Sequence, residues 1–291
     1  MKVVLFGGSA RVDEFRDALR AFPGVDLVAA DAPADLRAAL AGAEILLAGN
    51  RRYTPENAAI IRAAGTSLRW IQFTTSGIDK ARDSGLPPGV VVTNMAGMRA
   101  FAVAEHAMFL MLGVMRNVRA TEKARAAEDW CRDAVTPSLG NLAGKHLVVI
   151  GLGAIAREVA RKAKAFDMKV SAVTRSTETV DHVDALLPRS ALCAACAQAD
   201  IVLLSALYDD SADKMFGREA IAAMRPSAVF VNIARGRLVD EAALVEALAA
   251  RRIAGAGIDV AVDEPLPPDH AFWHMDNVLL TPHIGGAGGK G

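Results

Sequence analysis

Short apolar runs alternate with alanine-rich stretches along the whole chain. This alternation is typical of an α/β fold, in which helices connect the strands of a parallel sheet. In the first hundred residues the runs that read as strands are Val3–Phe6, Val25–Ala29, Ile45–Ala48, Trp70–Phe73 and Val90–Thr93. Helices are predicted between them, for example Val12–Ala21 and Pro55–Ala64, the second with Thr54 as its N-cap and Pro at its first position.

A second alternating series begins after residue 145. Its predicted strands are His146–Ile150, Val170–Val173, Ile201–Leu204, Val229–Ile233, Gly257–Val260 and Val278–Leu280. Six strands in succession, joined by helical crossovers, is the strand count of a doubly wound dinucleotide-binding fold. The pattern therefore predicts two α/β domains, the second of Rossmann type.

The segment between the two series is the most apolar part of the sequence. Ala100–Met115 is 16 residues long and contains Glu105 and His106, whereas a membrane-spanning helix needs about 20 mostly uncharged residues. A buried helix is therefore predicted. The polar stretch that follows, from Arg119 to Asn141, is predicted to be a hinge or a covering loop.

Composition narrows the functional classes. The chain of 291 residues has 33 Lys plus Arg and 33 Asp plus Glu, so its formal net charge is zero. Without a run of like charge, neither a nucleic acid nor an acidic membrane is an expected partner, because both depend on clustered cations. The short apolar start does not resemble a signal peptide, and the histidines show no metal-ligand spacing, so no metal is predicted.

Three cysteines form no disulfide framework, which favours a reducing, cytoplasmic location. Cys193 and Cys196 have the spacing of a redox motif. They lie, however, in an alanine-rich helical stretch without a second cysteine pair. Packing of small residues in a helix is the favoured interpretation, and a redox or zinc site is the alternative.

A glycine motif follows the first strand of the second series. Gly151-Leu152-Gly153-Ala154-Ile155-Ala156 has the Gly-x-Gly-x-x-Ala pattern, with a buried strand before it and an amphipathic helix after it. Gly151 permits a tight turn, Gly153 lets the backbone approach a pyrophosphate, and Ala156 lets the helix pack on the strand. The cofactor's phosphates are then expected at the N–H groups that begin the helix.

The end of the next strand indicates which dinucleotide is bound. NAD enzymes usually place Asp or Glu there, where it accepts hydrogen bonds from the ribose hydroxyls. This chain has Thr174, Arg175 and Ser176 and no acid. A guanidinium and hydroxyls suit a 2′-phosphate, so NADP(H) is predicted to be preferred, with NAD(H) as a possible cofactor. The alternative is that Arg175 is only a solvated loop residue.

Three later segments carry a family resemblance. They are Val231-Asn232-Ile233-Ala234-Arg235-Gly236-Arg237, Gly255-Ala256-Gly257-Ile258-Asp259 through Glu264-Pro265, and Thr281-Pro282-His283. Their order and their spacing behind the glycine motif resemble the D-isomer-specific 2-hydroxyacid dehydrogenase family, and specifically its glyoxylate and hydroxypyruvate reductases. The resemblance covers nearly the whole chain.

The resemblance implies roles for three residues. Arg235 matches the arginine that holds the substrate's carboxylate and carbonyl oxygens, for which a planar fork is suited. His283 matches the acid/base that protonates the forming alkoxide. Glu264 matches the carboxylate that orients this ring and favours its imidazolium form. Taken singly, such residues are more often structural: Arg235 a turn cap, Glu264 a solvated residue and His283 a packed residue. Their joint occurrence in this order favours the functional interpretation.

The same resemblance implies further contacts. Asp259 corresponds to a position at the nicotinamide end of the cofactor, and Ile233 and Ala234 correspond to cofactor-binding positions. The backbone N–H groups of Ser76, Gly77 and Ile78 correspond to those that receive the substrate carboxylate. Residues 1–98 are thus expected to be the substrate domain and residues 99–284 the cofactor domain.

Three features depart from the family pattern. Ala206 and Leu207 stand where relatives commonly have Leu-Pro, so we expect a differently shaped cofactor-facing loop. Arg51 and Arg52 lie in a loop that borders the substrate in relatives; either they engage a second acidic group or they are solvated. The resemblance also implies a return helix after residue 284, of which residues 285–291 hold only the start. The sequence therefore indicates either a truncated chain or a variant without that helix.

Together these features predict an NADPH-preferring reductase of a small 2-oxo acid that forms the D-2-hydroxy acid. The alternative is a dinucleotide-sensing binding protein without catalysis, because the family includes transcriptional corepressors that retain the fold. A homodimer is implied by the resemblance, with the Ala100–Met115 helix in its interface. That helix is equally explained as one buried inside a single subunit.

Overall fold

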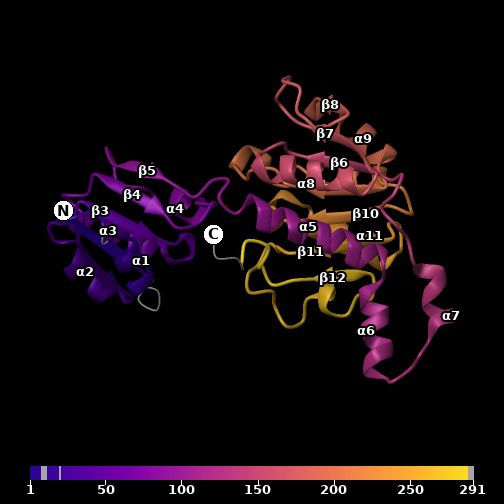
Figure 1. The fold of residues 1–291 in the computed structure, drawn as a ribbon, viewed down its shortest axis with the longest axis horizontal. Coiled ribbons are helices and arrows are strands. Elements are labelled where there is room, and N and C mark those ends of the chain that lie inside the picture. Colours follow the sequence, from indigo (N-terminus) through magenta and orange to yellow (C-terminus); the bar gives the residue numbers. More distant parts are fainter. Residues whose placement is uncertain (8–11, 20, 288–291) are drawn as a thin grey trace. The chain divides into compact units, whose positions relative to one another are not determined.

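The computed structural model describes residues 1–7, 12–19 and 21–287 (Figure 1). The chain divides into two compact units, unit 1 from Met1 to Met98 and unit 2 from Arg99 to Gly291. Each unit contains a parallel sheet with helices, so the α/β prediction is confirmed. Gly8 and Ser9, for which a simple turn is the expectation, and residues 288–291 of the expected return segment lie outside the described residues.

Unit 1 is built on a five-stranded sheet with the order β2-β1-β3-β4-β5. Its strands are β1 (Lys2–Phe6), β2 (Asp26–Ala30), β3 (Ile45–Ala48), β4 (Trp70–Phe73) and β5 (Val91–Thr93). Its helices are α1 (Val12–Leu19), α2 (Pro33–Leu40), α3 (Pro55–Ala64) and α4 (Asp79–Ser84), with a 3-10 turn at Asn50–Arg52. Every strand pair is parallel.

Local signals in the sequence account for the start of α3. The Thr54 hydroxyl accepts a hydrogen bond from the Asn57 N–H at 3.3 Å, and Pro55 occupies the first position of α3. The predicted N-cap is thereby confirmed. The core of the unit lies between one face of the sheet and helices α2 and α3, where Phe6, Leu36 and Ile61 are buried.

Unit 2 contains a seven-stranded parallel sheet with the order β12-β11-β10-β9-β6-β7-β8. Its strands are β6 (His146–Ile150), β7 (Lys169–Val173), β8 (Ala185–Leu187), β9 (Ile201–Leu204), β10 (Val229–Asn232), β11 (Gly255–Ile258) and β12 (Val278–Leu280). The prediction of six strands is wrong by one, because it omits β8. This strand lies at the edge of the sheet and pairs with β7 alone.

Helices cover both faces of this sheet (Figure 1). They are α5 (Ala100–Met115), α8 (Ala154–Ala165), α9 (Leu192–Gln198), α10 (Arg218–Ala223) and α11 (Glu241–Ala249). Two further helices, α6 (Val118–Ala126) and α7 (Arg132–Val135), follow α5 in the chain. Alternate residues of the strands point to opposite faces. Leu147 and Val149 of β6 pack in the core with α5 and α8, whereas Val148 and Ile150 pack in the core with α9, α10 and α11.

Helix α5 is buried along one side, as predicted, and lies directly on β11. At Gly257 a Cβ atom would approach the Leu110 Cβ to 2.8 Å, so glycine permits this close packing. No single helix within the described residues is long and apolar enough to span a membrane. Helices α5 and α6 pass that test only as a pair, and their axes are bent by 68°.

The prediction of a hinge or covering loop between Arg119 and Asn141 is wrong. Most of this stretch is helical, with α6, α7 and a 3-10 turn at Thr136–Ser138. Helices α6 and α7 have no buried residues, and they extend away from the body of unit 2 in Figure 1. We call residues 117–140 the arm. Its polar composition reflects the absence of buried residues in these helices rather than an absence of helix.

Candidate active site

The candidate site residues of unit 2 follow the carboxyl ends of its strands. Because all seven strands are parallel, these ends lie at one edge of the sheet, where ligands bind in open α/β folds. Strands β6 and β9 are neighbours, and the chain reverses its direction of winding between them. This reversal is the position at which a crevice for a dinucleotide is expected.

The glycine motif forms the turn from β6 to α8. Gly151 has φ +89°, and a Cβ there would lie 2.6 Å from the Ala206 Cα, so both conformation and space require glycine. Gly153 is the N-cap of α8, no side chain caps this helix, and a Cβ at Gly153 would meet no atom within 4 Å. Open space therefore lies before the N–H groups of Ala154 and Ile155. This arrangement fits a pyrophosphate at the helix start.

The loop after β7 carries the predicted 2′-phosphate contacts. The Thr174 hydroxyl accepts the Ser176 N–H at 3.1 Å, and the Thr174 N–H donates to Leu187 O of β8 at 2.9 Å. Arg175 between them is exposed. The Asp209 carboxyl, in the loop after β9, has its pKa lowered by a hydrogen bond from Ser211 and, among smaller causes, by the charge of Arg175. The charges of these two loops are thus close enough to interact.

Arg235 lies just beyond β10 in a turn that Asn232 holds. The buried Asn232 amide accepts the Ala234 N–H at 3.0 Å and donates to Arg235 O at 3.2 Å. Ile233 and Ala234 are each only 7% exposed. The Arg235 side chain is half-buried, and its Nη1 donates to Ala234 O at 2.6 Å. At the next residue, Gly236, a Cβ would lie 2.0 Å from the Ala261 carbonyl carbon, so this turn packs against the loop after β11.

His283 and Glu264 are paired, as the resemblance implies. His283 Nδ1 lies 2.6 Å from Glu264 Oε2, and about one third of each side chain is exposed. His283 has φ +55°, and its N–H donates to Asp259 O at 2.8 Å. Glu264 Oε1 accepts the Ala261 N–H at 3.3 Å. Because Nδ1 is held by the carboxylate, Nε2 is the ring nitrogen available for proton transfer.

Asp259 is buried and serves as an anchor for the loop that carries His283. Its carboxylate accepts hydrogen bonds from the Thr281 hydroxyl at 2.6 Å and from the Ile284 and Gly285 N–H groups at 2.9 Å each. Burial raises the pKa of Asp259, but these bonds and one from His106 outweigh it and lower the pKa to about 2. The predicted contact of Asp259 with nicotinamide stays a prediction.

His106 is a site component that the sequence interpretation missed. Its Nε2 lies 2.9 Å from the Thr281 hydroxyl and 3.2 Å from Asp259 Oδ1. Helix α5 brings it there from a distant part of the sequence, so no spacing signal marked it. It is a structural histidine, and it belongs to the hydrogen-bond network that holds the loop of His283.

In unit 1, Ser76, Gly77 and Ile78 form the loop between β4 and α4. The Ser76 hydroxyl donates to Met95 O at 2.9 Å, the Asn94 amide donates to Ser76 O at 2.7 Å, and the Thr75 hydroxyl donates to Gly77 O at 2.9 Å. These bonds fix the loop without using its N–H groups. The role of those N–H groups toward a carboxylate stays a prediction.

Other residues singled out in the sequence have varied surroundings. Asp240 is the N-cap of α11 and accepts the Ala243 N–H at 3.1 Å. Cys196 is buried in α9, which fits the packing interpretation, whereas Cys193 is exposed, which does not. Within the described residues no group of three or more His, Cys, Asp or Glu could hold a metal ion. Arg51 is exposed, and the Arg52 side chain lies over Gly7.

The fold and these loops define a dinucleotide-binding domain with a histidine–carboxylate pair at its ligand-binding edge. Residues 108–285 match the family model described as D-isomer specific 2-hydroxyacid dehydrogenase, NAD binding domain. This match covers more than half of the chain. The chain therefore belongs to the D-isomer-specific 2-hydroxyacid dehydrogenase family.

Named relatives support this assignment. A glyoxylate reductase of Pyrococcus furiosus is 35% identical over 204 residues, which are 68% of this chain and 60% of that protein. A solved D-isomer specific 2-hydroxyacid dehydrogenase family protein from Aeromonas salmonicida has a TM-score of 0.86 and 27% identity, covering 98% of this chain and 89% of that chain. A family member from Xanthobacter autotrophicus, solved with NADPH and MES, has a TM-score of 0.81 and 25% identity, covering 98% and 88%.

Proposed function

We propose that this protein reduces a small 2-oxo acid, such as glyoxylate or hydroxypyruvate, to the D-2-hydroxy acid with a nicotinamide dinucleotide. The observation that carries the proposal is the 2.6 Å hydrogen bond between His283 Nδ1 and Glu264 Oε2 at the carboxyl edge of a dinucleotide-binding sheet. A purely cofactor-binding domain has no need of such a pair. The glyoxylate reductase of Pyrococcus furiosus supports the substrate class.

The bound dinucleotide supplies a hydride to the carbonyl carbon of the substrate. The Arg235 guanidinium holds the carboxylate and the carbonyl oxygen, and its positive charge stabilises negative charge that develops on that oxygen. His283 gives the proton on Nε2 to the oxygen, which completes the hydroxyl group. The Glu264 carboxylate keeps the ring oriented and stabilises the charged imidazolium from which this proton is taken.

The proposed preference for NADP(H) rests on the loop after β7. Residues 174–177 contain no acid, and the exposed Arg175 and the neighbouring hydroxyls suit a 2′-phosphate. The Xanthobacter autotrophicus family member was solved with NADPH. Asp209 opposes this preference, because its negative charge interacts with Arg175 and therefore competes with a 2′-phosphate for that guanidinium.

The test is turnover with a panel of 2-oxo acids and each dinucleotide. We expect NADPH oxidation with glyoxylate and hydroxypyruvate, slower oxidation of NADH, and a D-configured product from hydroxypyruvate. Tight binding of NADPH without turnover of any acid in the panel would favour the non-catalytic, corepressor-like alternative. The intact Arg235, Glu264 and His283 count against that alternative.

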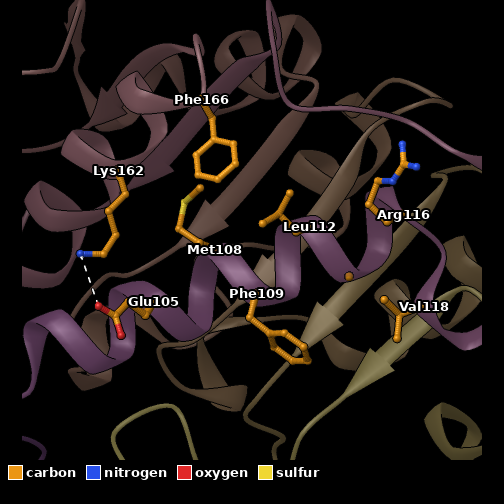
Figure 2. Close-up of a pocket in the computed structure, with 9 residues that line it drawn as sticks. Glu105, Met108, Phe109, Leu112, Arg116, Val118, Lys162 and Phe166 are labelled. Carbon is orange, nitrogen blue, oxygen red and sulfur yellow. Dashed lines mark ion pairs between the residues drawn. The ribbon is translucent and has the colours of Figure 1, made fainter. Parts of the chain in front are cut away.

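A homodimer through unit 2 is the proposed assembly. Helix α5 buries one side in the unit and exposes a stripe on the other, where Phe101 is 60% and Phe109 46% exposed. Residues four apart on a helix share a face, so Phe101, Glu105 and Phe109 form one stripe. Figure 2 shows the pocket beside it, of about 490 Å³, between Met108 and Phe109 of α5 and Phe166 at the end of α8.

The arm supports the same assembly. Helices α6 and α7 are unburied in a single chain, and Trp130 between them is 95% exposed. A second copy of unit 2 would cover both the arm and the α5 stripe. Sedimentation analysis is expected to show a dimer that Phe109→Asp dissociates, while the control Phe22→Asp, at an exposed residue of unit 1, leaves it intact. A monomeric wild-type protein would contradict the proposal.

The proposed location is the cytoplasm. It rests on the three cysteines, none of which forms a disulfide.

A further inference from the structure

One carboxylate closes the base of the loop that carries Glu264. This loop, residues 262–270, runs from the end of β11 toward the 3-10 turn Ala271–Trp273. Glu241 Oε2 accepts the Val262 N–H at 3.0 Å, and Glu241 Oε1 lies 3.3 Å from His270 Nε2. Val262 begins the loop and His270 ends it. Both ends are therefore held by a single side chain.

The hydrogen-bond pattern assigns the proton on His270. The backbone N–H of Phe272 can only donate, and it lies 3.2 Å from His270 Nδ1, so Nδ1 is the acceptor. In the neutral ring the proton is then on Nε2, which donates it to Glu241. The ring also packs against Phe272, with centroids 4.6 Å apart, and Phe272 is buried. The pair is therefore fixed at the histidine end by the core of unit 2.

Glu241 also connects this loop to the turn that carries Arg235. It is the first residue of α11, whose N-cap Asp240 is separated from the turn at Gly236–Leu238 by Val239 alone. That turn packs against the backbone of Ala261, as Gly236 shows. With about 18% of its side chain exposed, Glu241 is shielded from solvent, where its hydrogen bonds are stronger than at the surface. It has no direct contact with Glu264 or His283 among the hydrogen bonds described.

We infer that Glu241 and His270 are positioning residues for the Glu264–His283 pair. The inference rests on the proposed function only for its effect on turnover. We call the two bonds that Glu241 makes, to the Val262 N–H and to His270, the clamp. The clamp fixes the path of the loop, and the loop fixes the Glu264 carboxylate at 2.6 Å from His283 Nδ1. When the clamp is broken, the Glu264 carboxylate moves and the ring loses the partner that orients it. Catalytic geometry depends on such supporting contacts.

The variant Glu241→Gln breaks the clamp with little change in volume. Val262 and His270 donate to different oxygens of Glu241, and in the amide one of these two positions is an NH2 group, which cannot accept. Glu246→Gln is the matched control, because Glu246 lies in the same helix and its carboxylate pairs with Arg218 at the surface, 2.6 Å away. His270→Gln is a second variant that removes one of the two clamp bonds. Circular dichroism and NADPH binding show that each variant is folded.

The measurement that does not depend on turnover is NMR of the protein labelled with ¹⁵N-histidine. The proton between His283 Nδ1 and Glu264 gives a low-field resonance, assigned by its loss in His283→Ala and Glu264→Gln. We expect Glu241→Gln to shift or broaden this resonance, His270→Gln to do so less, and Glu246→Gln to leave it unchanged. In turnover, kcat is expected to fall about tenfold for Glu241→Gln with KM unchanged.

The two kinds of failure are distinguishable. A folded Glu241→Gln or His270→Gln with the wild-type resonance would overturn the positioning role, even if the wild-type protein reduces 2-oxo acids. A wild-type protein without turnover would overturn the proposed function, while the resonance would still decide whether the clamp positions Glu264.

Discussion

The two halves of the ligand-binding edge of unit 2 are built differently. Around β10, β11 and β12, carboxylates and amides hold each loop: Asp259 and Asn232 each bind the backbone at two points, and Glu241 binds the Val262 N–H and the His270 ring. Around β6, β7 and β9, the loops depend on glycine and on short hydroxyls, and Arg175 and Leu207 are exposed. We call these the clamped half and the open half.

The difference indicates a division of labour. Proton transfer requires donor and acceptor within hydrogen-bond distance, so the groups that perform it gain from rigid support. A dinucleotide binds over a long path through many contacts, and exposed side chains can adjust to it. The clamped half is therefore expected to govern rate and stability, and the open half to govern affinity and cofactor choice.

The largest effect is expected in the clamped half at His283. In His283→Ala the proton donor to the carbonyl oxygen is lost, and kcat is expected to fall about a thousandfold. The dissociation constant for NADPH, measured by fluorescence titration, is expected to stay near the wild-type value. Retention of most activity would remove His283 from the acid/base role.

The next effect is on stability, at Asp259. Its pKa of about 2 lies below that of an ordinary aspartate, so its contribution to folding is complete above pH of about 4 and is lost as pH falls toward 2. Asp259→Asn is expected to lower the free energy of unfolding by about 2 kcal/mol at neutral pH. Urea unfolding at several pH values measures this.

The control for Asp259 is Asp276→Asn. Asp276 is exposed and pairs with Arg251 at the surface, so its loss is expected to change stability by less than about 1 kcal/mol. Two results would show that the Asp259 network does not stabilise the clamped half. One is an equal loss of unfolding free energy in Asp259→Asn and Asp276→Asn. The other is a difference in unfolding free energy between wild type and Asp259→Asn that does not shrink in acid.

In the open half, Arg175→Ala is expected to change affinity alone. Loss of a charge-assisted hydrogen bond to the 2′-phosphate raises the dissociation constant for NADPH about tenfold. The dissociation constant for NADH and the free energy of unfolding are expected to stay unchanged. The control is Arg125→Ala on the arm, in which both dissociation constants and the free energy of unfolding should match the wild type. Equal weakening of NADPH and NADH would mean that Arg175 does not recognise the 2′-phosphate.

The smallest effect is expected at Leu207, which is 87% exposed. Leu207→Ala is expected to change the unfolding free energy by less than about 0.5 kcal/mol. In contrast, Leu204→Ala, three residues earlier in the core, is expected to cost about 3 kcal/mol. A large destabilisation by Leu207→Ala would show that this loop is packed rather than open.

The sequence predicted the parts of the molecule that depend on local pattern. The strands of both sheets follow from apolar runs such as Ile45–Ala48 and Ile201–Leu204, and the turn at Gly151 follows from the motif that needs its positive φ. The His283–Glu264 pair came from the family resemblance, because no local pattern links residues 264 and 283.

What the sequence did not predict depends on contacts between distant residues. His106 reaches Asp259 only because α5 crosses β11, and Glu241 reaches His270 only because the first residue of α11 lies beside the end of the loop after β11. The strand β8 needs its pairing with β7, and the helices of the arm are polar on all sides, so neither shows a clear amphipathic pattern.

The most direct test of the proposed function is the reduction of hydroxypyruvate by the wild-type protein with NADPH. D-glycerate and NADP⁺ should form in equal amounts, and the rate should fall about a thousandfold in His283→Ala. NADPH binding without oxidation across the panel of 2-oxo acids would contradict the account.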